Sequence, residues 1–509
     1  MARRLLTLAV LIAAAGCGDD PCQPASSELP TAGFIQSRAD LPTEGCDSSL
    51  KGETPYGDWF VIRSNREPFG GSGPVRIEGE CGAPPNVVVG RIGRVDGYQT
   101  FVREDGEWIW HQFLVTENGF IERAYLICGQ NDDGSYRGHY KRCFQFDDFE
   151  RCDDEPVTMS PYGNIEGEPE AEGVELVAEY RGEGEGWPAA FAANVRVKDG
   201  IAYFVNGTDG LRIVDVSDLE APFEIGFLEA ESDFFNDVKL TTDPEGKQYA
   251  LIASDVLGVL SVDVSDPQNP EVVAIFTPSG DPMHGVHTLY LDTFEGAPAA
   301  FIVDGFSGVL GVYDITDPAL PVRVGEYNLG DEPAFHDLYV ENGLIYLNAT
   351  VGGMHIVDPS LPEPVLGIFD SGDYSHSNWV TTGGGRKISV HGGEGFDAGI
   401  QIVDVDPESP QYLQTVGEYQ TREQVSAHNI QAFGERAFIA YYEDGLRILD
   451  LSDPQSPVQI GHFNSWSPDN WDGSYLSGMA GIDVHPDDGL VFASDSQRGL
   501  LILRLTLDD

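Results

Sequence analysis

Basic residues are scarce in this sequence. Its 509 residues include 29 Lys and Arg against 84 Asp and Glu, a formal net charge of -55 at pH 7 that is spread along the chain. Such a field repels phosphate backbones and anionic lipid, which excludes nucleic acid as a partner. The excess of acid indicates a highly soluble surface, and a weak attraction for cations or cationic partners is the alternative.

Several signatures of known chemistry are also missing. There is no nucleophile-elbow serine motif, no phosphate-binding loop and no H-E-x-x-H, and GEGEGW is an acidic loop rather than a dinucleotide-binding sequence. Long segments with an apolar period of 3.6 residues are lacking too, which excludes helical repeats. What remains are short β-type segments separated by Gly, Asp and Asn, so the chain is predicted to be all-β.

A single long apolar run lies at the start of the chain, in MARRLLTLAVLIAAAGCGDD, and it is too short to span a bilayer. Two arginines, an apolar run, small residues and Cys17 follow one another in an order that resembles a bacterial lipoprotein signal peptide, although Ala14 stands where such signals prefer Leu. The resemblance implies that residues 1–16 are removed, that Cys17 is lipidated, and that the protein is exported to the cell envelope or outer surface on a membrane anchor. An ordinary cleaved signal peptide is the alternative.

The other cysteines form an even set confined to the first third of the chain. In an exported protein this pattern favours disulfide bonds, with a pairing that the spacing leaves open. A zinc site is less favoured, because no C-x-x-C pair occurs. The six disulfide candidates are Cys22, Cys46, Cys81, Cys128, Cys143 and Cys152.

Composition divides the part of the chain before the repeats into three stretches. Residues 17–48, rich in Pro, Ser and Gly, predict a tether. Residues 49–155 contain aromatic β-type segments separated by turn signals, which predict a small disulfide-bonded antiparallel β domain. Its Gly57-Asp58-Trp59 is similar to the GxW of lipocalin-type barrels, a match too short to imply a bound ligand. The acidic residues 156–171 predict a linker.

The remainder of the chain repeats one segment seven times. The copies are GLRIVDVSDLEAP, GVLSVDVSDPQNP, VLGVYDITDPALP, GMHIVDPSLPEP, GIQIVDVDPESP, GLRILDLSDPQSP and GLLILRLTL. A period of about 45 residues made only of β-type segments is that of a propeller blade. The repeated aspartate is expected to bond the backbone at a turn, a structural role. It recurs every 44 to 51 residues, with Arg504 in the seventh place, at Asp215, Asp263, Asp314, Asp358, Asp404 and Asp450.

Four strands can be assigned to each copy except the last, which ends at Asp509 without an outer strand. The pattern of that missing strand occurs at VELVAEYRG, residues 174–182, just before the first copy. We therefore expect this segment to complete the seventh blade, so that residues 172–509 form a closed seven-bladed ring. No unpaired strand edge is then expected where the two ends of the repeat array meet.

These GLRIVDVSDP units resemble LVIVD repeats, which occur in bacterial secreted and surface proteins and are expected to form β-propellers. The resemblance covers about residues 172–505 by the repeat criterion. It implies the fold, but propellers host binding, scaffolding and enzymatic functions alike.

One column of the aligned copies is rich in histidine, although the chain has only 11. It lies two places before the first apolar residue of the inner strand, so its members are expected at one end of the central channel. Adjacent imidazoles suit iron, copper, zinc or manganese. In copy order the column contains Ala193, Asn236, His287, His336, His376, His428 and Ala480. Candidates for further contacts are His284, His391, Asp237 and Asp337.

Two interpretations of this column remain open. The four histidines could hold one metal ion, an arrangement that resembles the axial histidines of carotenoid-cleaving oxygenases and selenium-binding-type proteins, although no motif of either is present. Alternatively, each ring bonds a carbonyl of the neighbouring blade and packs into the seam. The loop HGGEGFDAG, longer than its counterparts, is expected at the channel rim.

We expect an exported, lipid-anchored propeller that acts as a platform for a protein or polysaccharide partner. The alternative is a metal-dependent enzyme, an oxidase or a hydrolase, that uses the histidines at the axis.

Overall fold

A computed structural model gives the structure of most of the chain. The residues it describes are 34–35, 40–41, 46, 59–64, 73–78, 86–91, 94–102, 107–116, 119–132, 134–146, 149–182, 192–231, 233–278, 285–303, 308–328, 334–361, 363–372, 374–395, 398–470 and 476–507. Within these ranges, no helix has both the length and the apolar character needed to cross a membrane. The chain divides into two compact units, Met1–Gly163 with Gly473–Tyr475, and Asn164–Asp472 with Leu476–Asp509.

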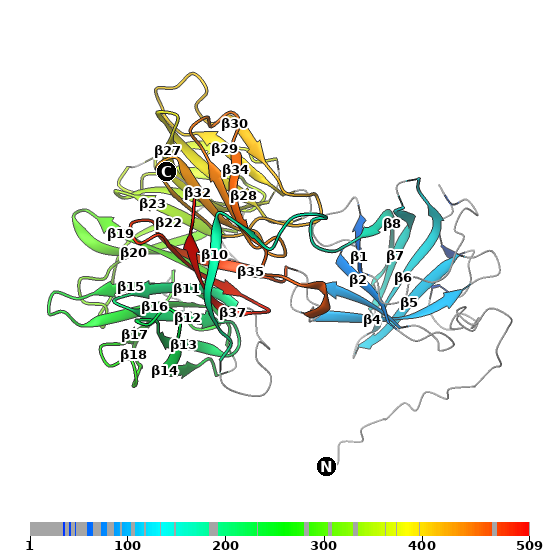
Figure 1. Ribbon diagram of the computed structural model, residues 1–509, viewed down its shortest axis with the longest axis horizontal. Helices are drawn as coiled ribbons and strands as arrows, with labels where there is room; N and C mark the ends of the chain where they lie inside the picture. Colours follow the sequence, from blue (N-terminus) through cyan, green and yellow to red (C-terminus); the bar gives the residue numbers. More distant parts are fainter. Residues whose placement is uncertain are drawn as a thin grey trace, which may run out of the picture. The chain divides into compact units, whose positions relative to one another are not determined.

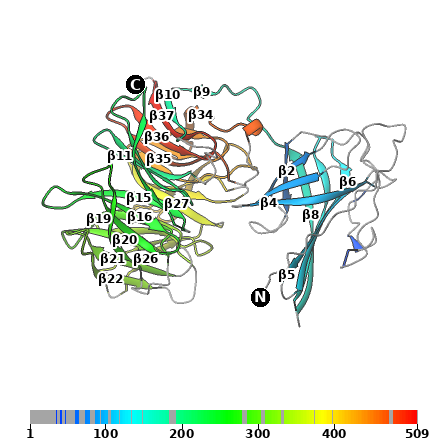
Figure 2. The ribbon, with the colours of Figure 1, turned by 90° about the horizontal axis from the view of Figure 1, so that it is seen from below.

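The first unit is a closed antiparallel barrel, formed by eight of the described strands (Figures 1 and 2). Each strand pairs with the next, and the first pairs with the eighth, so that this barrel has no open sheet edge. The strands are β1 (Trp59–Ser64), β2 (Gly73–Glu78), β3 (Asn86–Arg91), β4 (Arg94–Val102), β5 (Trp108–Thr116), β6 (Gly119–Gln130), β7 (Tyr136–Phe146) and β8 (Phe149–Pro161).

Large side chains fill the interior of the barrel. Trp110 and Tyr125 are fully buried and lie in one cluster with Phe60, Tyr140 and Met159. Alternation along the strands directs these residues inward. The aromatic content of the sequence here is therefore explained by core packing.

Strand β8 continues to Pro161 and includes six residues that composition assigns to a linker. Its acidic residues face basic ones across the ladder, with Asp153 opposite Arg142 and Asp154 opposite Lys141. Cross-strand pairs of opposite charge stabilise a sheet. A run of acid that looks like linker sequence is thus compatible with a strand once its partner is known.

The outer face of β6 holds part of the segment that composition assigns to a tether. Glu122, which is fully buried, accepts hydrogen bonds from the backbone N–H of Phe34 at 2.5 Å and of Ile35 at 3.1 Å. It also accepts one from His111 Nε2 at 2.8 Å. A buried carboxylate needs such donors, and here they fix the preceding chain against the barrel.

Two disulfides staple this unit, which confirms the disulfide prediction for four cysteines. Cys46 joins Cys128, and Cys143 joins Cys152 across the paired strands β7 and β8. The remaining candidates, Cys22 and Cys81, lie outside the described residues, as does Cys17.

The second unit consists of antiparallel sheets arranged as a β-propeller, and seven such sheets occur among the described residues (Figure 1). Their strands, sheet by sheet, are β11 (Ala192–Lys198), β12 (Ile201–Asn206), β13 (Gly210–Asp215) and β14 (Phe223–Glu229); β15 (Phe235–Thr242), β16 (Gln248–Ser254), β17 (Gly258–Asp263) and β18 (Glu271–Phe276); β19 (Thr288–Phe294), β20 (Ala297–Val303), β21 (Val309–Asp314) and β22 (Val322–Asn328); β23 (Asp337–Glu341), β24 (Leu344–Asn348), β25 (Met354–Val357) and β26 (Val365–Phe369); β27 (Ser375–Gly383), β28 (Arg386–Gly393), β29 (Ile400–Asp404) and β30 (Thr415–Tyr419); β31 (Ile430–Phe433), β32 (Arg436–Ala440), β33 (Leu446–Asp450) and β34 (Val458–Phe463), with β9 (Ala171–Glu172) at its edge; and β10 (Val174–Tyr180), β37 (Gly499–Leu505), β36 (Leu490–Asp495) and β35 (Met479–His485). A short 3-10 turn, η2, covers Pro468–Asn470.

The first strand of each repeat is the inner one, and these inner strands contact one another in a closed circuit: β11, β15, β19, β23, β27, β31, β35 and back to β11. In the sheet that contains the last repeat, the outer strand is β10, which precedes the first repeat. It pairs antiparallel with β37 from Val174 opposite Leu505 to Tyr180 opposite Leu500. One sheet thus joins the two ends of the repeat array.

The repeated aspartates have the structural role expected of them. Each accepts a hydrogen bond at 2.7 to 3.1 Å from the backbone N–H two residues further on, as the chain turns from the third strand to the fourth. This is the Asx-turn arrangement. None of these six carboxylates lines the axial cavity described below.

Candidate functional site

The column that contains the histidines lies where the inner strands leave regular pairing. In four sheets the register shifts by one residue at this column, which is a β-bulge, and the residues skipped are Ala193, Asn236, His376 and Ala480. A bulge redirects the side chain of the extra residue. In the other three sheets the column residue lies one or two places before the inner strand, and its N–H bonds the second strand, as seen for His287, His336 and His428.

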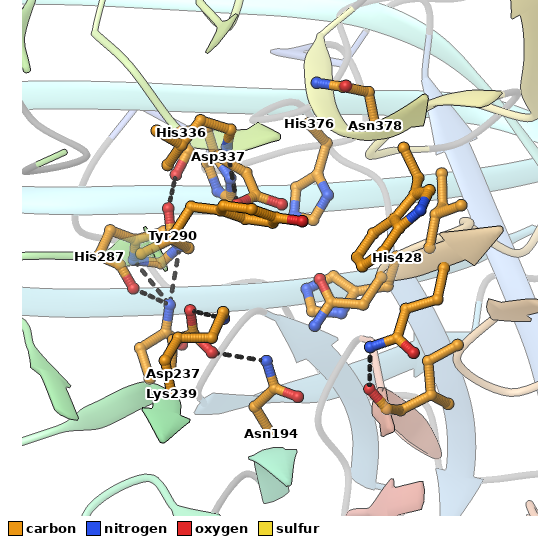
Figure 3. A pocket seen from close by; sticks show the side chains of 18 of the residues that line it. Asn194, Asp237, Lys239, His287, Tyr290, His336, Asp337, His376, Asn378 and His428 are labelled. Atoms are coloured by element: carbon orange, nitrogen blue, oxygen red, sulfur yellow. Dashed lines mark hydrogen bonds and ion pairs between the residues drawn. The ribbon is translucent and has the colours of Figure 1, made fainter. Parts of the chain in front are cut away.

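The four histidines form one continuous row of touching rings, as Figure 3 shows from close by. Ring centroids are 4.4 Å apart for His287 and His336, 4.2 Å for His336 and His376, and 4.5 Å for His376 and His428. The histidines therefore face the axial cavity and one another.

A carboxylate that the column did not include completes this cluster. Glu394 Oε1 lies 3.8 Å from His376 Nε2 and 3.9 Å from His428 Nε2. The hydroxyl of Tyr442 donates a hydrogen bond of 2.7 Å to the same oxygen. Glu394 belongs to the loop HGGEGFDAG, and the unusual length of that loop was the feature of the sequence that could have pointed to it. No feature of the sequence pointed to Tyr442.

The two histidines at the ends of the row, His287 and His428, have different hydrogen-bond partners. His428 Nδ1 lies 2.6 Å from the carbonyl of Ala480, and because a carbonyl only accepts, Nδ1 carries the proton and Nε2 the lone pair. His287 contacts Asp255 through Nδ1 at 3.3 Å and the side-chain amide of Asn236 at 3.1 Å. The ring of His287 thus already contacts two polar side chains, those of Asn236 and Asp255.

The central histidine has no such partners. The side chain of His376 is 2% exposed, and neither of its ring nitrogens has a hydrogen-bond partner among the described residues. Nδ1 of His336 is likewise buried without a hydrogen-bond partner among the described residues. Buried polar atoms without partners are rare in native proteins and call for a specific cause.

The environment keeps three of these rings neutral. Burial, together with neighbouring histidines, holds the pKa of His336 and of His376 well below the ordinary range, and burial lowers the pKa of His428 to about 4. For His287, burial opposes the charge, but the contact with Asp255 outweighs it and raises the pKa. Neutral imidazole is the form that binds metal ions.

A second polar group lines the same cavity. Asp237 accepts hydrogen bonds from Asn194 at 2.8 Å and from Lys239 at 2.5 Å (Figure 3). Asp337 also lines the cavity, and burial raises its pKa to about 6. The cavity has a volume of about 50 Å³, enough for a few water molecules or a very small ligand.

Of the other candidates for additional contacts, His391 does not line this cavity. Nε2 of His391 bonds the hydroxyl of Ser375 at 2.8 Å. It lines a different pocket, next to Gln401 and Tyr419. His284 lies outside the described residues.

The comparisons with known proteins agree with the repeat pattern. The LVIVD repeat model matches residues 191–228 and 426–465, which are the first and sixth repeats. The chain therefore contains LVIVD repeats in an all-β, propeller-type fold. No curated protein matches the sequence.

Several solved structures, one of them described as a beta propeller, are similar to this chain at low identity. The WD40 beta propeller domain of Doa1 is 14% identical, with a TM-score of 0.45, over 65% of this chain and 97% of that one. BamB from Moraxella catarrhalis is 9% identical, with a TM-score of 0.41, over 77% and 96%. A chain of the mitotic checkpoint complex is 9% identical, with a TM-score of 0.47, over 66% and 94%.

Proposed function

We propose that this protein is an exported, lipid-anchored, seven-bladed propeller whose outer rim binds a partner protein. A polysaccharide partner is compatible with export, but the chemistry of the rim favours protein. The observation that carries the proposal is a belt of exposed apolar side chains on the outer strands of four consecutive sheets.

This apolar belt lies on β14, β18, β22 and β26. Its most exposed members are Phe223 at 54%, Ile275 at 52%, Val322 at 60% and Ile368 at 51%. Contiguous exposed apolar surface on a soluble protein marks interaction sites. An outer strand also offers unpaired backbone groups, to which an extended segment of a partner can add as a further strand.

The other three sheets lack this feature in the residues that the structure describes. Strand β30 has no exposed large apolar residue, β34 has one, Val458 at 58%, and none is exposed on β10. The edge of β34 is also partly covered by β9. A belt limited to four consecutive sheets supports a binding site for a defined partner. A general property of the surface would be expected on every sheet.

The test compares positions inside and outside the belt. A photo-reactive benzophenone amino acid replaces Ile275, Val324 or, as the matched control, Val458 in the cells that produce the protein. We expect a protein adduct at Ile275 and Val324 and none at Val458. The purified partner should then bind Ile275→Glu and Val324→Glu about tenfold more weakly, and Val458→Glu normally.

Two outcomes would contradict the partner surface. Adducts of equal yield at all three positions would remove the specificity of the belt. An adduct made of two copies of this chain would assign the belt to self-association.

The lipid anchor is tested separately. Metabolic labelling with a fatty-acid probe should mark the mature chain, and Cys17→Ser should abolish the label. Labelling that survives this substitution would disprove lipidation at Cys17.

A metal-dependent oxidase or hydrolase is the second candidate. It is favoured by the buried, unpartnered ring nitrogens of His376 beside Glu394. Model ester and phenol substrates should be turned over by the purified chain and not after treatment with a chelator. Equal rates before and after chelation would refute this function.

A further inference from the structure

The axial cluster has the donor geometry of a cation site. One ligand atom from each of His336, His376 and Glu394 lies within 4.8 Å of the other two. Nitrogen and oxygen ligands at about 2.1 Å from a tetrahedral ion are about 3.4 Å apart. The separations of 3.8 and 3.9 Å from Glu394 Oε1 to His376 and His428 exceed this value by only a few tenths of an ångström.

The unpartnered nitrogens of His376 point independently to a ligand. A buried donor or acceptor that bonds neither protein nor water destabilises the folded state. The same ring lies at the centre of the row, between His336 and His428 and beside Glu394. An ion bound here would give the nitrogens of His376 the partner that the described residues do not supply.

We propose that this end of the axial cavity binds one divalent transition-metal ion through the mutually close side chains of His336, His376 and Glu394. His428, whose Nε2 lies 3.9 Å from Glu394 Oε1, supplies the fourth ligand. His287 is not a ligand in this proposal, because its ring nitrogens already contact Asn236 and Asp255. The site is independent of the partner surface on the outer strands, and either proposal can fail without the other.

Neighbouring groups hold the proposed ligands in position. Tyr442 donates to the oxygen of Glu394 that faces the histidines, and the Ala480 carbonyl fixes the tautomer of His428 that leaves Nε2 as the ligand atom. Metal-binding imidazoles and carboxylates commonly have such outer partners, and losing one weakens binding. Tyr442 and Ala480 are thus positioning residues.

The ligand set also selects the class of ion. Three imidazoles and one carboxylate suit zinc, iron, copper and other first-row divalent ions, whereas calcium and magnesium require mostly oxygen. This distinction matters for so acidic a chain, since surface carboxylates attract calcium without any histidine. Calcium is therefore a control ion.

The experiment uses the purified full chain, freed of metal by a chelator and then titrated with Co²⁺. We expect one Co²⁺ per chain by elemental analysis, together with the visible absorption bands of cobalt bound by nitrogen and oxygen. Zn²⁺ should displace the cobalt and remove the bands, and excess Ca²⁺ should not. Absence of the bands, or their removal by Ca²⁺, would overturn the proposal.

Matched variants separate a metal site from a structural cluster. His376→Leu should abolish the bands and also raise the Tm of the metal-free protein, because an apolar side chain replaces an unsatisfied polar one. Glu394→Gln should weaken Co²⁺ binding about 10–100-fold and Tyr442→Phe about tenfold. His287→Ala and His355→Leu should keep the stoichiometry, since His355 is buried on β25 and bonds Gly352.

Loss of binding in His287→Ala equal to that in His376→Leu would contradict the ligand set. Bands that persist in His376→Leu would refute the site itself. If His376→Leu does not fold, Glu394→Gln and Tyr442→Phe decide, since both replacements keep the volume of the side chain, and unchanged binding in both would overturn the proposal.

Discussion

Glu443 is a buried carboxylate whose surroundings do not satisfy it. Glu443 is only 3% exposed. Its Oε1 accepts a hydrogen bond of 3.1 Å from the backbone N–H of Ser477, and its Oε2 has no hydrogen-bond partner among the described residues. Burial raises the pKa of this group to about 7 from its ordinary value of 4.5. The neighbouring Asp444, in contrast, is paired with Arg422 at 2.7 Å.

The raised pKa predicts a pH-dependent stability. Between pH 4.5 and 7 the unfolded chain releases the proton of Glu443 while the folded chain keeps it, so the free energy of unfolding falls as the pH rises. The loss amounts to about 3 kcal/mol, at about 1.4 kcal/mol for each pKa unit. Glu443→Gln should lack this component when urea unfolding is compared with the native chain from pH 5 to 8.

An exposed carboxylate provides the control for this comparison. Glu408→Gln, at an exposed turn position, should leave the pH profile of stability unchanged. A Glu443→Gln profile parallel to that of the native chain would disprove the assignment.

Strand β9 has two residues and yet occupies a defined place at the edge of β34. Its ladder with β34 joins only Glu172 to His462 and Ala171 to Phe463. A buried ion pair just before it strengthens the attachment, alongside hydrogen bonds from the side chains of His462 and Asn464. Arg447, fully buried on β33, donates to both oxygens of Glu168, at 2.8 and 3.0 Å.

The two members of this pair should differ in what their removal costs. Glu168→Leu leaves the guanidinium of Arg447 buried without its counter-charge, and we expect a loss of about 3–5 kcal/mol in the free energy of unfolding. Arg447→Met should cost less, because the side chain of Glu168 is 15% exposed and can reach water. The double variant should be more stable than Glu168→Leu alone, measured by chemical denaturation.

A surface pair within the same unit is the reference. Arg504 and Glu175 pair at 2.8 Å with side chains 45% and 52% exposed, and Arg504→Met should cost less than about 1 kcal/mol. Equal losses for Arg447→Met and Glu168→Leu would argue against the burial explanation.

Closure of the ring depends on residues from the two ends of the repeat array. Strand β10 pairs with β37, and its Tyr180 donates a hydrogen bond of 2.8 Å to Glu224 on β14. One segment thereby connects the last sheet to the first. Without it, β37 would present an open edge and the neighbouring apolar residues would reach water.

Deleting Val174–Tyr180 should therefore lower the Tm of the propeller and make its unfolding less cooperative. A synthetic peptide of residues 172–182 should bind the deleted chain and restore both properties, and a scrambled peptide of the same composition should not. Unchanged unfolding after the deletion, followed by calorimetry, would show that the other sheets hold the ring without β10.

The propeller repeats could be recognised in the sequence because each repeat is formed by contacts between residues that are close in the chain. A blade is a single meander in which strands pair with their neighbours in the chain, so VDVSDP turns and apolar alternation recur with each copy. The histidine column emerged for the same reason, since equivalent positions of a repeat meet near the axis. Glu394 did not emerge, because it comes from an insertion that no other copy shares, and Tyr442 belongs to another sheet.

The strands of the first unit were harder to predict from the sequence. Its β character followed from aromatic and β-branched segments, but the end of the acidic strand β8, residues 156–161, was assigned to a linker. The pairing of β8 depends on partners elsewhere in the barrel, such as β1, which lies about a hundred residues away in the chain. The pairing of Cys46 with Cys128 was likewise beyond sequence spacing, because it depends on where a distant segment packs.

The amino-acid sequence alone was sufficient for the all-β class, the period of the repeats, the structural role of the aspartates and the histidine column, since each depends on contacts between residues close in the chain. Only the tertiary structure decided the closure of the barrel, the disulfide pairing and the meeting of Glu394 with His376 and His428. These depend on the register and packing of elements far apart in sequence, which local patterns do not encode.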